Sequence, residues 1–363
     1  MKIGIITLPP SFNYGNILQA WALQTVLERM GHRVDIVVAR PRRYKLPPSK
    51  KLFVYVKRFL LKYFWGNKNI ILHYEERLPE LLRHTERFIQ QHLHIHEYYS
   101  FANIGEKDYE AYVVGSDQIW RRRYNSDIRN CYLFFTEGWG VKRIAYAASF
   151  GTSNWEYSPE ETKDCAELLS RFDGISVREA DAVRLVKEKF HLKAHHVLDP
   201  TLLLNREEYE QLILNSSTPH SAGDMLCYLL SDEPQYNNII EEIASDRGLT
   251  PFKVYSRFDD QSVPMRERIQ LPVETWLRGF YDAKLVITDS FHATVFSIIF
   301  QKPFILFGSG IRGNERMESL LKMVGFDITN GITNKIFTPT SIHMEVIYIH
   351  RQDALDFLIN HLN

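Results

Sequence analysis

The sequence predicts an α/β protein of two domains that face a cleft, each built on a parallel sheet covered by helices. Apolar runs of strand length alternate with amphipathic runs of helix length along most of the chain, as parallel sheets require. The length of 363 residues exceeds that of one ordinary core and suits two domains. An Asp-Pro pair at 199–200 marks a passage between them.

The first domain opens with a βαβ pattern. An apolar run at 2–8 and a polar loop lead into an amphipathic run at 17–30, which stops at Gly31 before a second strand at 34–39. The pattern then continues with expected strands at 112–114, 143–147 and 174–177 and a helix at 179–190.

The second domain follows residues 196–204, which read as a strand ending in the Asp-Pro turn. Strands are expected at 225–230, 252–256, 284–288 and 303–307, and helices at about 235–247, 273–280, 291–300 and 315–324. We therefore place the domains at 1–196 and 197–345. An amphipathic run at 352–362 predicts a last helix, and we expect the segment 346–363 to pack back on the first domain.

Composition excludes several classes of function. Lys plus Arg and Asp plus Glu each total 44, so the overall charge does not indicate nucleic-acid binding. Three widely spaced cysteines argue against a disulfide framework or a zinc site and favour a reducing cytoplasm. No apolar stretch approaches the roughly 20 residues that span a bilayer. We expect a cytoplasmic protein.

Residues 284–307 place a histidine at the start of a helix. A strand ends at Thr288, Asp289 and Ser290 can cap the helix, and His292 falls in its first turn. Free N–H groups at such a helix start, beyond the carboxyl end of a parallel strand, bind anions. The helix dipole disfavours imidazolium and a bound phosphate would restore it. The alternative is a histidine near the cap that is satisfied by a backbone carbonyl.

Six short blocks stand in a fixed order along the chain: NYGN at 13–16, GSDQIW at 115–120, ASFG at 148–151, SVRE at 176–179, VLDPT at 197–201 and TDSFHATVF at 288–296. Together they resemble the polysaccharide pyruvyl transferase family over about residues 3–325. The resemblance implies a glycosyltransferase-B-like pair of Rossmann-like domains, with the sugar acceptor on the N-terminal domain and phosphoenolpyruvate on the C-terminal one. It also implies transfer of the carboxyethylidene group onto two sugar hydroxyls, giving a cyclic pyruvate ketal in a capsule or exopolysaccharide precursor.

The resemblance implies that Arg178 and His292 bind the donor. A guanidinium can grip a carboxylate or phosphate through two hydrogen bonds, although Arg178 can instead pair with Glu179 or Asp199. A further cation follows the histidine by about twenty residues in the family. Arg312 and Arg316 are both candidates here, and Asn314 is expected to cap the next helix. Further substrate-binding candidates come from the same blocks: Ser116, Gln118, Ser149, Phe150, Ser290 and Ala293.

Ketal formation needs an acid and a base. Protonated His292 can supply the proton for the methylene carbon of the donor, and a carboxylate can deprotonate the sugar hydroxyl. Asp117 is the first choice for this base because it follows the strand at 112–114, where loops meet the cleft. An Asx turn or helix cap is the alternative reading of Asp117, and Glu179 is the reserve base.

The acceptor is expected to be a sugar held by polar groups and aromatic faces. Asn13, Tyr14 and Asn16 lie in the first strand-to-helix loop, Gly15 allows close approach, and Trp120 can stack on a sugar. The alternatives are helix caps for the two asparagines and core packing for the two aromatic residues. The sequence has no GxGxxG, DxD or His-rich motif, so no cofactor or metal is expected beyond phosphoenolpyruvate as co-substrate.

A basic segment stands apart from these blocks. Residues 40–68 carry ten Lys or Arg residues and no Asp or Glu, and 52–65 are amphipathic and aromatic. We hypothesise peripheral contact with the inner face of the membrane here, next to a lipid-linked oligosaccharide acceptor. The alternative is a helical excursion with solvated lysines.

Two rival functions remain open from sequence alone. A nucleotide-sugar-dependent glycosyltransferase would use the same two-domain plan, with a diphosphate at Ser290. A catalytically silent carbohydrate-binding or complex-organising subunit is the second, against which the presence of both Arg178 and His292 argues.

Overall fold

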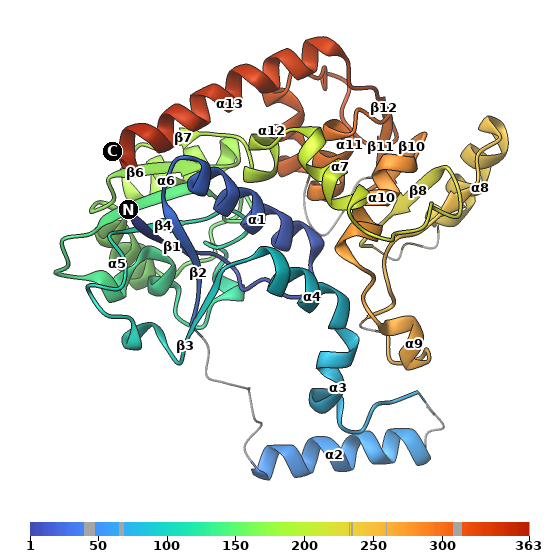
Figure 1. Cartoon of the computed structure of the whole chain (residues 1–363), viewed down its shortest axis with the longest axis horizontal. Helices are drawn as coiled ribbons and strands as arrows, with labels where there is room; N and C mark the ends of the chain where they lie inside the picture. The colour runs from blue at the N-terminus through green and yellow to red at the C-terminus, as the bar shows by residue number, and fades with distance from the viewer. Residues whose placement is uncertain are drawn as a thin grey trace.

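The computed structural model describes residues 1–39, 48–64, 69–231, 233, 235–258, 260–307 and 314–362. These residues form two parallel sheets with helices packed on them, so the predicted α/β class is confirmed (Figure 1). No helix in the described ranges is long and apolar enough to cross a bilayer.

The N-terminal sheet has seven strands in the order β3-β2-β1-β4-β5-β6-β7, and every neighbouring pair is parallel. Its strands are β1 Lys2–Ile6, β2 Arg33–Ala39, β3 Ile95–Tyr98, β4 Ala111–Val114, β5 Lys142–Ala148, β6 Gly174–Val177 and β7 His195–His196. The accompanying helices are α1 Tyr14–Arg29, α2 Pro48–Tyr63, α3 Tyr74–Leu81, α4 Arg83–His92, α5 Pro159–Leu169 and α6 Ala180–Phe190. Short 3₁₀ turns occupy Phe101–Asn103, Arg122–Tyr124, Ile128–Tyr132 and Phe134–Thr136.

The C-terminal sheet has the order β12-β11-β10-β8-β9, with only β12 antiparallel to its neighbour. Its strands are β8 Met225–Tyr228, β9 Pro251–Phe252, β10 Leu285–Thr288, β11 Phe304–Leu306 and β12 Ile336–Phe337. The helices are α7 Arg206–Leu214, α8 Gln235–Arg247, α9 Met265–Arg268, α10 Val273–Asp282, α11 Phe291–Ile299, α12 Glu315–Met323 and α13 Ser341–Leu362.

The expected strand at 196–204 is wrong. Only β7 extends there, and Pro200–Leu203 form a 3₁₀ turn instead. The carboxylate of Asp199 accepts hydrogen bonds from the backbone N and the hydroxyl of Thr201, and Pro200 has no N–H for a sheet ladder. The local side-chain bonds therefore replace strand pairing at this crossing.

Helix α13 bridges the two sheets (Figure 1). At its start His343 stacks on Phe326 of the C-terminal part, and at its end Phe357 lies beside Tyr146 of β5. Lys142 of β5 donates to the carbonyl of Leu362 at 3.0 Å. The helix starts at Ser341, eleven residues before the amphipathic run at 352–362 that predicted it. The apolar residues of its first turns are not confined to one side, so no amphipathic pattern marked them as helical.

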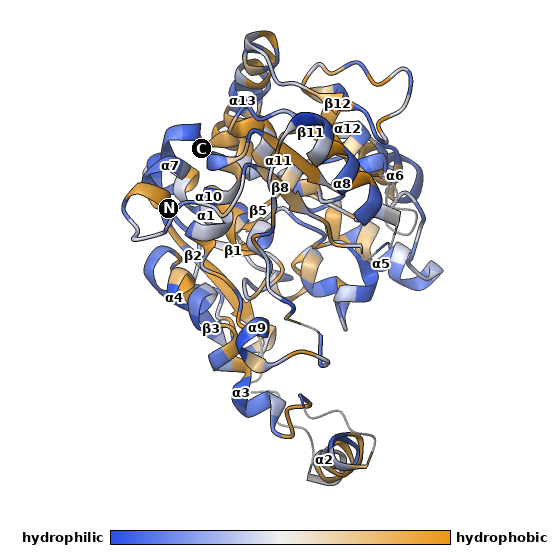
Figure 2. Ribbon diagram, turned by 90° about the vertical axis from the view of Figure 1, so that its right-hand side faces the viewer, coloured by the Kyte–Doolittle hydropathy of each residue, from blue (hydrophilic) through white to orange (hydrophobic). Residues whose placement is uncertain are grey.

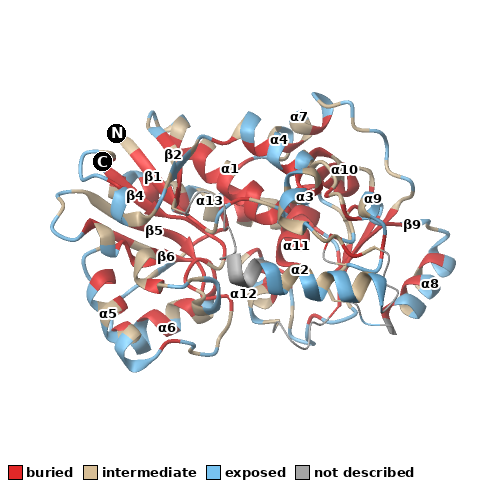
Figure 3. Cartoon of the chain, turned by 90° about the horizontal axis from the view of Figure 1, so that it is seen from below, coloured by how far each residue is buried: buried red, intermediate tan, exposed pale blue. Residues whose placement is uncertain are grey.

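Helices α1 and α11 lie in the interior between the two sheets (Figure 3). All nine residues of α11 are buried, which explains why its sequence is apolar on every side. Side chains of both sheets and both helices belong to one continuous apolar cluster. The two helix starts are therefore held rigidly with respect to each other.

Candidate active site

The starts of α1 and α11 meet at His292. Each helix follows a parallel strand, β1 or β10, and each is capped by a side chain that accepts a backbone N–H, Asn13 in α1 and Ser290 in α11. The imidazole of His292 lies against Gly15: a Cβ atom at position 15 would stand 2.1 Å from Nδ1 of the ring. Glycine is therefore required for the two helix starts to approach, and both present their positive ends to one place.

Arg178 follows β6 and is held by two buried carboxylates. It donates from Nη1 to Oδ2 of Asp199 at 2.8 Å and from Nε to Oε1 of Glu179 at 3.1 Å. Its Cζ lies 4.2 Å from the centre of the Phe291 ring. The alternative that Arg178 pairs with Glu179 or Asp199 is therefore what the structure shows, and it pairs with both. Its Nη2 remains buried and has no hydrogen-bond partner among the described residues.

Asp199 lies between the arginine and the histidine. Nε2 of His292 is 3.8 Å from Oδ2 of Asp199, too far for a hydrogen bond, and like Nη2 of Arg178 it is buried without a partner in the described part of the chain. Sequence reasoning treated Asp199 only as a turn residue or a partner of Arg178. Asp199 follows β7 as Arg178 follows β6, so both residues lie at the same edge of the sheet. This position could have shown from the sequence that Asp199 belongs to the site.

Two predicted binding hydroxyls orient these carboxylates. Ser116 donates to Oδ2 of Asp199 at 2.9 Å, and Ser149 donates to Oε1 of Glu179 at 2.7 Å. Because each hydroxyl has a single proton, both donors are already committed. Ser116 and Ser149 fix the acidic groups around Arg178.

Asp117 stands at the carboxyl end of β4 in a left-handed conformation, with φ of 57°. Its carboxylate is buried and accepts from Nδ2 of Asn16 at 3.5 Å, while the same amide also donates to the carbonyl of Leu8. Aspartate tolerates this conformation better than most residues, and such backbone strain often accompanies function. The charge of Asp117 favours the protonated forms of Arg178 and His292, although burial still keeps the pKa of His292 below its ordinary value.

Burial and neighbouring charges set the protonation states. Burial by itself lowers the pKa of Arg178, but Glu179 and Asp199 outweigh it and raise that pKa above its usual value. Burial raises the pKa of Asp199, yet Arg178 and His292 bring it down to about 2. Burial lowers the pKa of His292, and Asp199 offsets this only in part. The site therefore holds a charged Arg178–Asp199 pair beside a neutral imidazole at neutral pH.

The third expected cation comes from the start of α12. Arg312 lies outside the described residues, whereas Arg316 falls in the first turn of the helix. Burial and the charge of Arg178 lower the pKa of Arg316, and its Nε has no hydrogen-bond partner among the residues that the structure places. Asn314 occupies the N-cap position but makes no capping hydrogen bond. Ser319 of the same helix accepts the backbone N–H of Ala180 at 2.9 Å, which ties α12 to α6.

Two aromatic predictions are corrected. Trp120 is fully buried, stacks on Tyr132 with ring centres 5.0 Å apart and donates its Nε1 to the carbonyl of Cys131. Tyr14 is buried against Trp276 and donates its hydroxyl to the carbonyl of Leu271 at 3.0 Å. Neither ring has a free face for a sugar, because tertiary packing covers both.

The remaining candidates take up structural positions. Asn13 is exposed and caps α1, as its alternative reading held. Phe150 packs in the aromatic cluster around Trp120, and Ala293 is fully buried in α11. Gln118 accepts from Nη1 of Arg121 at 2.7 Å and lies against Gly151.

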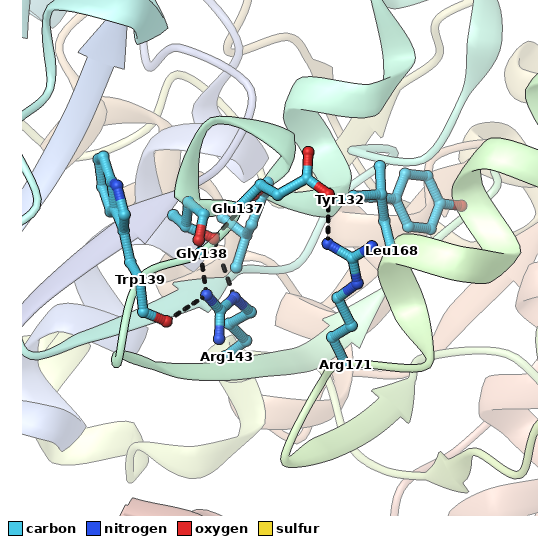
Figure 4. A pocket seen from close by; sticks show the side chains of 9 residues that line it. Tyr132, Glu137, Gly138, Trp139, Arg143, Leu168 and Arg171 are labelled. Carbon is cyan, nitrogen blue, oxygen red and sulfur yellow. Dashed lines mark hydrogen bonds and ion pairs between the residues drawn. The ribbon is translucent and has the colours of Figure 1, made fainter.

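A cavity of about 300 Å³ lies elsewhere, between β5 and α5 (Figure 4). Its two arginines are occupied: Arg143 donates to the carbonyls of Thr136, Trp139 and Val141, and Arg171 pairs with Glu137. Both arginines of this cavity are therefore already engaged by protein acceptors. Among the described residues, Arg178, His292 and Arg316 each keep a buried nitrogen without a hydrogen-bond partner, and their charges act on one another near the starts of α11 and α12.

The arrangement suits a small anion. Within the described ranges, three buried nitrogens have no hydrogen-bond partner, Nη2 of Arg178, Nε2 of His292 and Nε of Arg316, and two helix starts add positive potential. In the described ranges no cluster of three or more His, Cys, Asp or Glu side chains has the geometry of a metal site.

Comparison with known proteins agrees with this architecture. A family model described as polysaccharide pyruvyl transferase matches residues 13–310, more than half of the chain. The chain is 9% identical to UDP-GlcNAc 2-epimerase from Neisseria meningitidis bound to UDP-GlcNAc, covering 100% of this chain and 99% of that one with a TM-score of 0.51. UDP-GlcNAc 2-epimerase from Methanocaldococcus jannaschii is 13% identical, and the match covers 97% of this chain and 93% of that one with a TM-score of 0.47. E. coli ADP-heptose lps heptosyltransferase II is 14% identical, and the match covers 100% of this chain and 98% of that one with a TM-score of 0.37. No curated protein sequence matches significantly. The fold is glycosyltransferase-B-like, as the sequence predicted.

Proposed function

Because the chain belongs to the polysaccharide pyruvyl transferase family, we propose that it moves the pyruvyl group of phosphoenolpyruvate onto two hydroxyls of a sugar. The product is a cyclic pyruvate ketal in a cell-surface polysaccharide precursor. The observation that carries the proposal is a set of three buried nitrogens, on Arg178, His292 and Arg316, that have no hydrogen-bond partner in the described part of the chain and whose charges act on one another.

The donor fits these groups by charge and by hydrogen bonding. Phosphoenolpyruvate carries a phosphate and a carboxylate, both rich in acceptors. A buried donor without an acceptor costs about 1–3 kcal/mol, so a ligand that satisfies three donors recovers a large part of its own desolvation. Arg178 cannot rotate away to solvent, since Asp199 and Glu179 hold its other nitrogens. The arginine is thus preorganised for the anion.

The proposed reaction balances without another reactant. Protonated His292 gives a proton to the methylene carbon, and the first sugar hydroxyl adds to the adjacent carbon while Asp117 accepts its proton. The carbon–oxygen bond to phosphate then breaks, and the second hydroxyl adds in its place. Of the two hydroxyl protons, one replaces the proton given by His292 and the other leaves with phosphate.

Protonation of His292 is coupled to donor binding in this proposal. The imidazole is neutral at pH 7 because burial lowers its pKa. A phosphate dianion beside Nε2 raises that pKa and brings in the proton that the reaction consumes. The acid is therefore charged only when its substrate is present.

The acceptor is proposed to enter beside the loop between β1 and α1. Phe12 of this loop is 46% exposed and its ring stacks on Phe258 of the C-terminal part, with centres 5.3 Å apart. It takes over the sugar-stacking role first given to Trp120. We propose a lipid-linked oligosaccharide as the acceptor and the cytoplasmic face of the membrane as its place.

Transfer of label from phosphoenolpyruvate to a panel of lipid-linked and synthetic sugars tests the function. We expect transfer by the native chain, loss of roughly a hundredfold or more in His292→Asn, and stabilisation against heating by phosphoenolpyruvate but not by UDP-GlcNAc. Stabilisation by UDP-GlcNAc alone, with no transfer to any sugar, would contradict the proposal.

A further inference from the structure

Helix α2 exposes an apolar face that no described part of the chain covers. Its sixteen residues stand away from the two sheets, connected through α3 (Figures 1 and 2). Seven large apolar side chains lie on one arc of the helix, spaced by one, three or four residues, and all are exposed: Leu52, Phe53, Val56, Phe59, Leu60, Tyr63 and Phe64 of the following turn. Such a face in water is normally an interaction site.

The opposite face of α2 is the one that contacts the protein. Arg58 pairs with Glu75 at 2.9 Å and also donates to the carbonyl of Leu72. Lys62 donates to the carbonyl of Ile70, and Tyr55 lies edge-on to His73 with ring centres 4.6 Å apart. The helix is therefore anchored by its polar side and turns its apolar side outward. This orientation is the reverse of an ordinary surface helix.

The charge around this face indicates what covers it. The ten basic residues of 40–68 have no acidic residue among them, and Glu75 is the first acid after Asp35. Lys57 is exposed at the edge of the apolar arc. Aromatic and aliphatic side chains bordered by lysine match the boundary between acyl chains and anionic headgroups.

A second copy of the chain fits less well. The arc from Leu52 to Phe64 is about 20 Å long and one helix, about 10 Å, wide. Its area of roughly 200 Å² is well below the roughly 800 Å² per partner of a stable interface. Two such faces would also bring the Lys57 side chains of both copies to the same border, and 52–64 contain no Asp or Glu to pair them.

We infer that α2 docks the protein on an anionic lipid bilayer, with the arc from Leu52 to Phe64 inserted among the headgroups and Lys57 at the surface. The cluster of Leu78, Leu81 and Phe258 packs α3 beside the C-terminal part, and Phe258 stacks on Phe12 next to the α1 start. Docking through α2 therefore holds the loop beside His292 near the bilayer. Its use for a lipid-linked acceptor rests on the proposed function, whereas the docking itself does not.

Vesicle sedimentation of the full chain tests the docking. We compare vesicles of phosphatidylcholine with and without phosphatidylglycerol, and expect binding to the anionic vesicles that weakens as salt rises. Phe53→Ser with Phe59→Ser should weaken binding at least roughly tenfold, and Lys57→Gln about fivefold on anionic vesicles only.

A matched control lies on α13, where Ile342 and Ile349 are as exposed as the two phenylalanines. Ile342→Ser with Ile349→Ser should bind vesicles like the native chain. Equal loss in both double variants, no binding by the native chain, or a native dimer that Phe53→Ser with Phe59→Ser dissociates would each overturn the inference. Sugar transfer is not measured, so these outcomes are independent of the proposed reaction.

Discussion

Helices α11 and α2 both carry many apolar side chains, yet they end in opposite environments. Every residue of α11 is buried between the sheets, whereas no residue from Leu52 to Phe64 is buried. The difference comes from neighbours: α11 is packed against α10, α12 and the 3₁₀ turn at Pro200–Leu203, while α2 touches the rest of the chain through its polar side. An apolar sequence pattern indicates that a helix face is buried against something. Only the tertiary structure shows whether this chain or another molecule buries it.

The largest expected effect is in α11. Phe296 is fully buried, with ring centres 4.9 Å from Tyr209 and 5.0 Å from Trp276. Phe296→Ala should lower the free energy of unfolding by about 3–5 kcal/mol, because it removes buried apolar surface and leaves a cavity. Denaturant titration measures this, and a loss below about 1 kcal/mol would contradict the burial of α11.

The next effect concerns the buried charges at the start of α11. Asp199→Asn keeps the shape of the side chain but leaves Arg178 with Glu179 as its only ion-pair partner among the described residues. We expect a loss of about 3 kcal/mol in unfolding free energy. Asp181→Asn, which removes an exposed ion pair with Arg184, should change it by less than about 0.5 kcal/mol. Similar losses in the two variants would show that the Arg178 pair is not specially buried.

Gly15 tests how tightly the two helix starts meet. Gly15→Ala places a methyl group on the imidazole of His292, so we expect a loss of about 1–3 kcal/mol in stability and roughly a hundredfold in transfer. Gly140→Ala is the control, since nothing lies within 4 Å of its added Cβ. Activity that survives Gly15→Ala would mean that the histidine need not hold this position.

The smallest effect is expected on α2. Phe59→Ala should change the unfolding free energy by less than about 0.5 kcal/mol, since its side chain is exposed. A loss near that of Phe296→Ala would mean that part of the chain covers α2 in solution, and the comparison of the two helices would fail.

Sequence reasoning located the elements better than the contacts between them. The strand ends before Gly115, Arg178 and Asp289 and the helix start at Phe291 follow from local apolar period and capping residues. The first helix, expected at 17–30, starts earlier, at Tyr14, because Asn13 caps it.

Other features depend on segments that are distant in the sequence. Arg178 pairs with Asp199, and His292 contacts Gly15 at the far end of the chain. Trp120 is buried by tertiary packing against Tyr132. Local patterns do not show which of these contacts form. The turn at Pro200–Leu203 is different, because the bonds from Asp199 to Thr201 that replace the expected strand are local.

The central claim is that Arg178 and His292 bind a phosphorylated anion and that binding protonates the histidine. Calorimetric titration with phosphoenolpyruvate from pH 6 to 8, on the native chain and on His292→Gln, tests it most directly. Since burial lowers the pKa of free His292 and a phosphate raises it, affinity should fall as pH rises through the pKa of the bound state.

Phosphoenolpyruvate itself titrates in this pH range, and dividing the affinity of the native chain by that of His292→Gln removes this contribution. We predict proton uptake and a ratio of native to variant affinity that declines with pH. A ratio that stays constant from pH 6 to 8, or equal affinity in both proteins, would contradict the account.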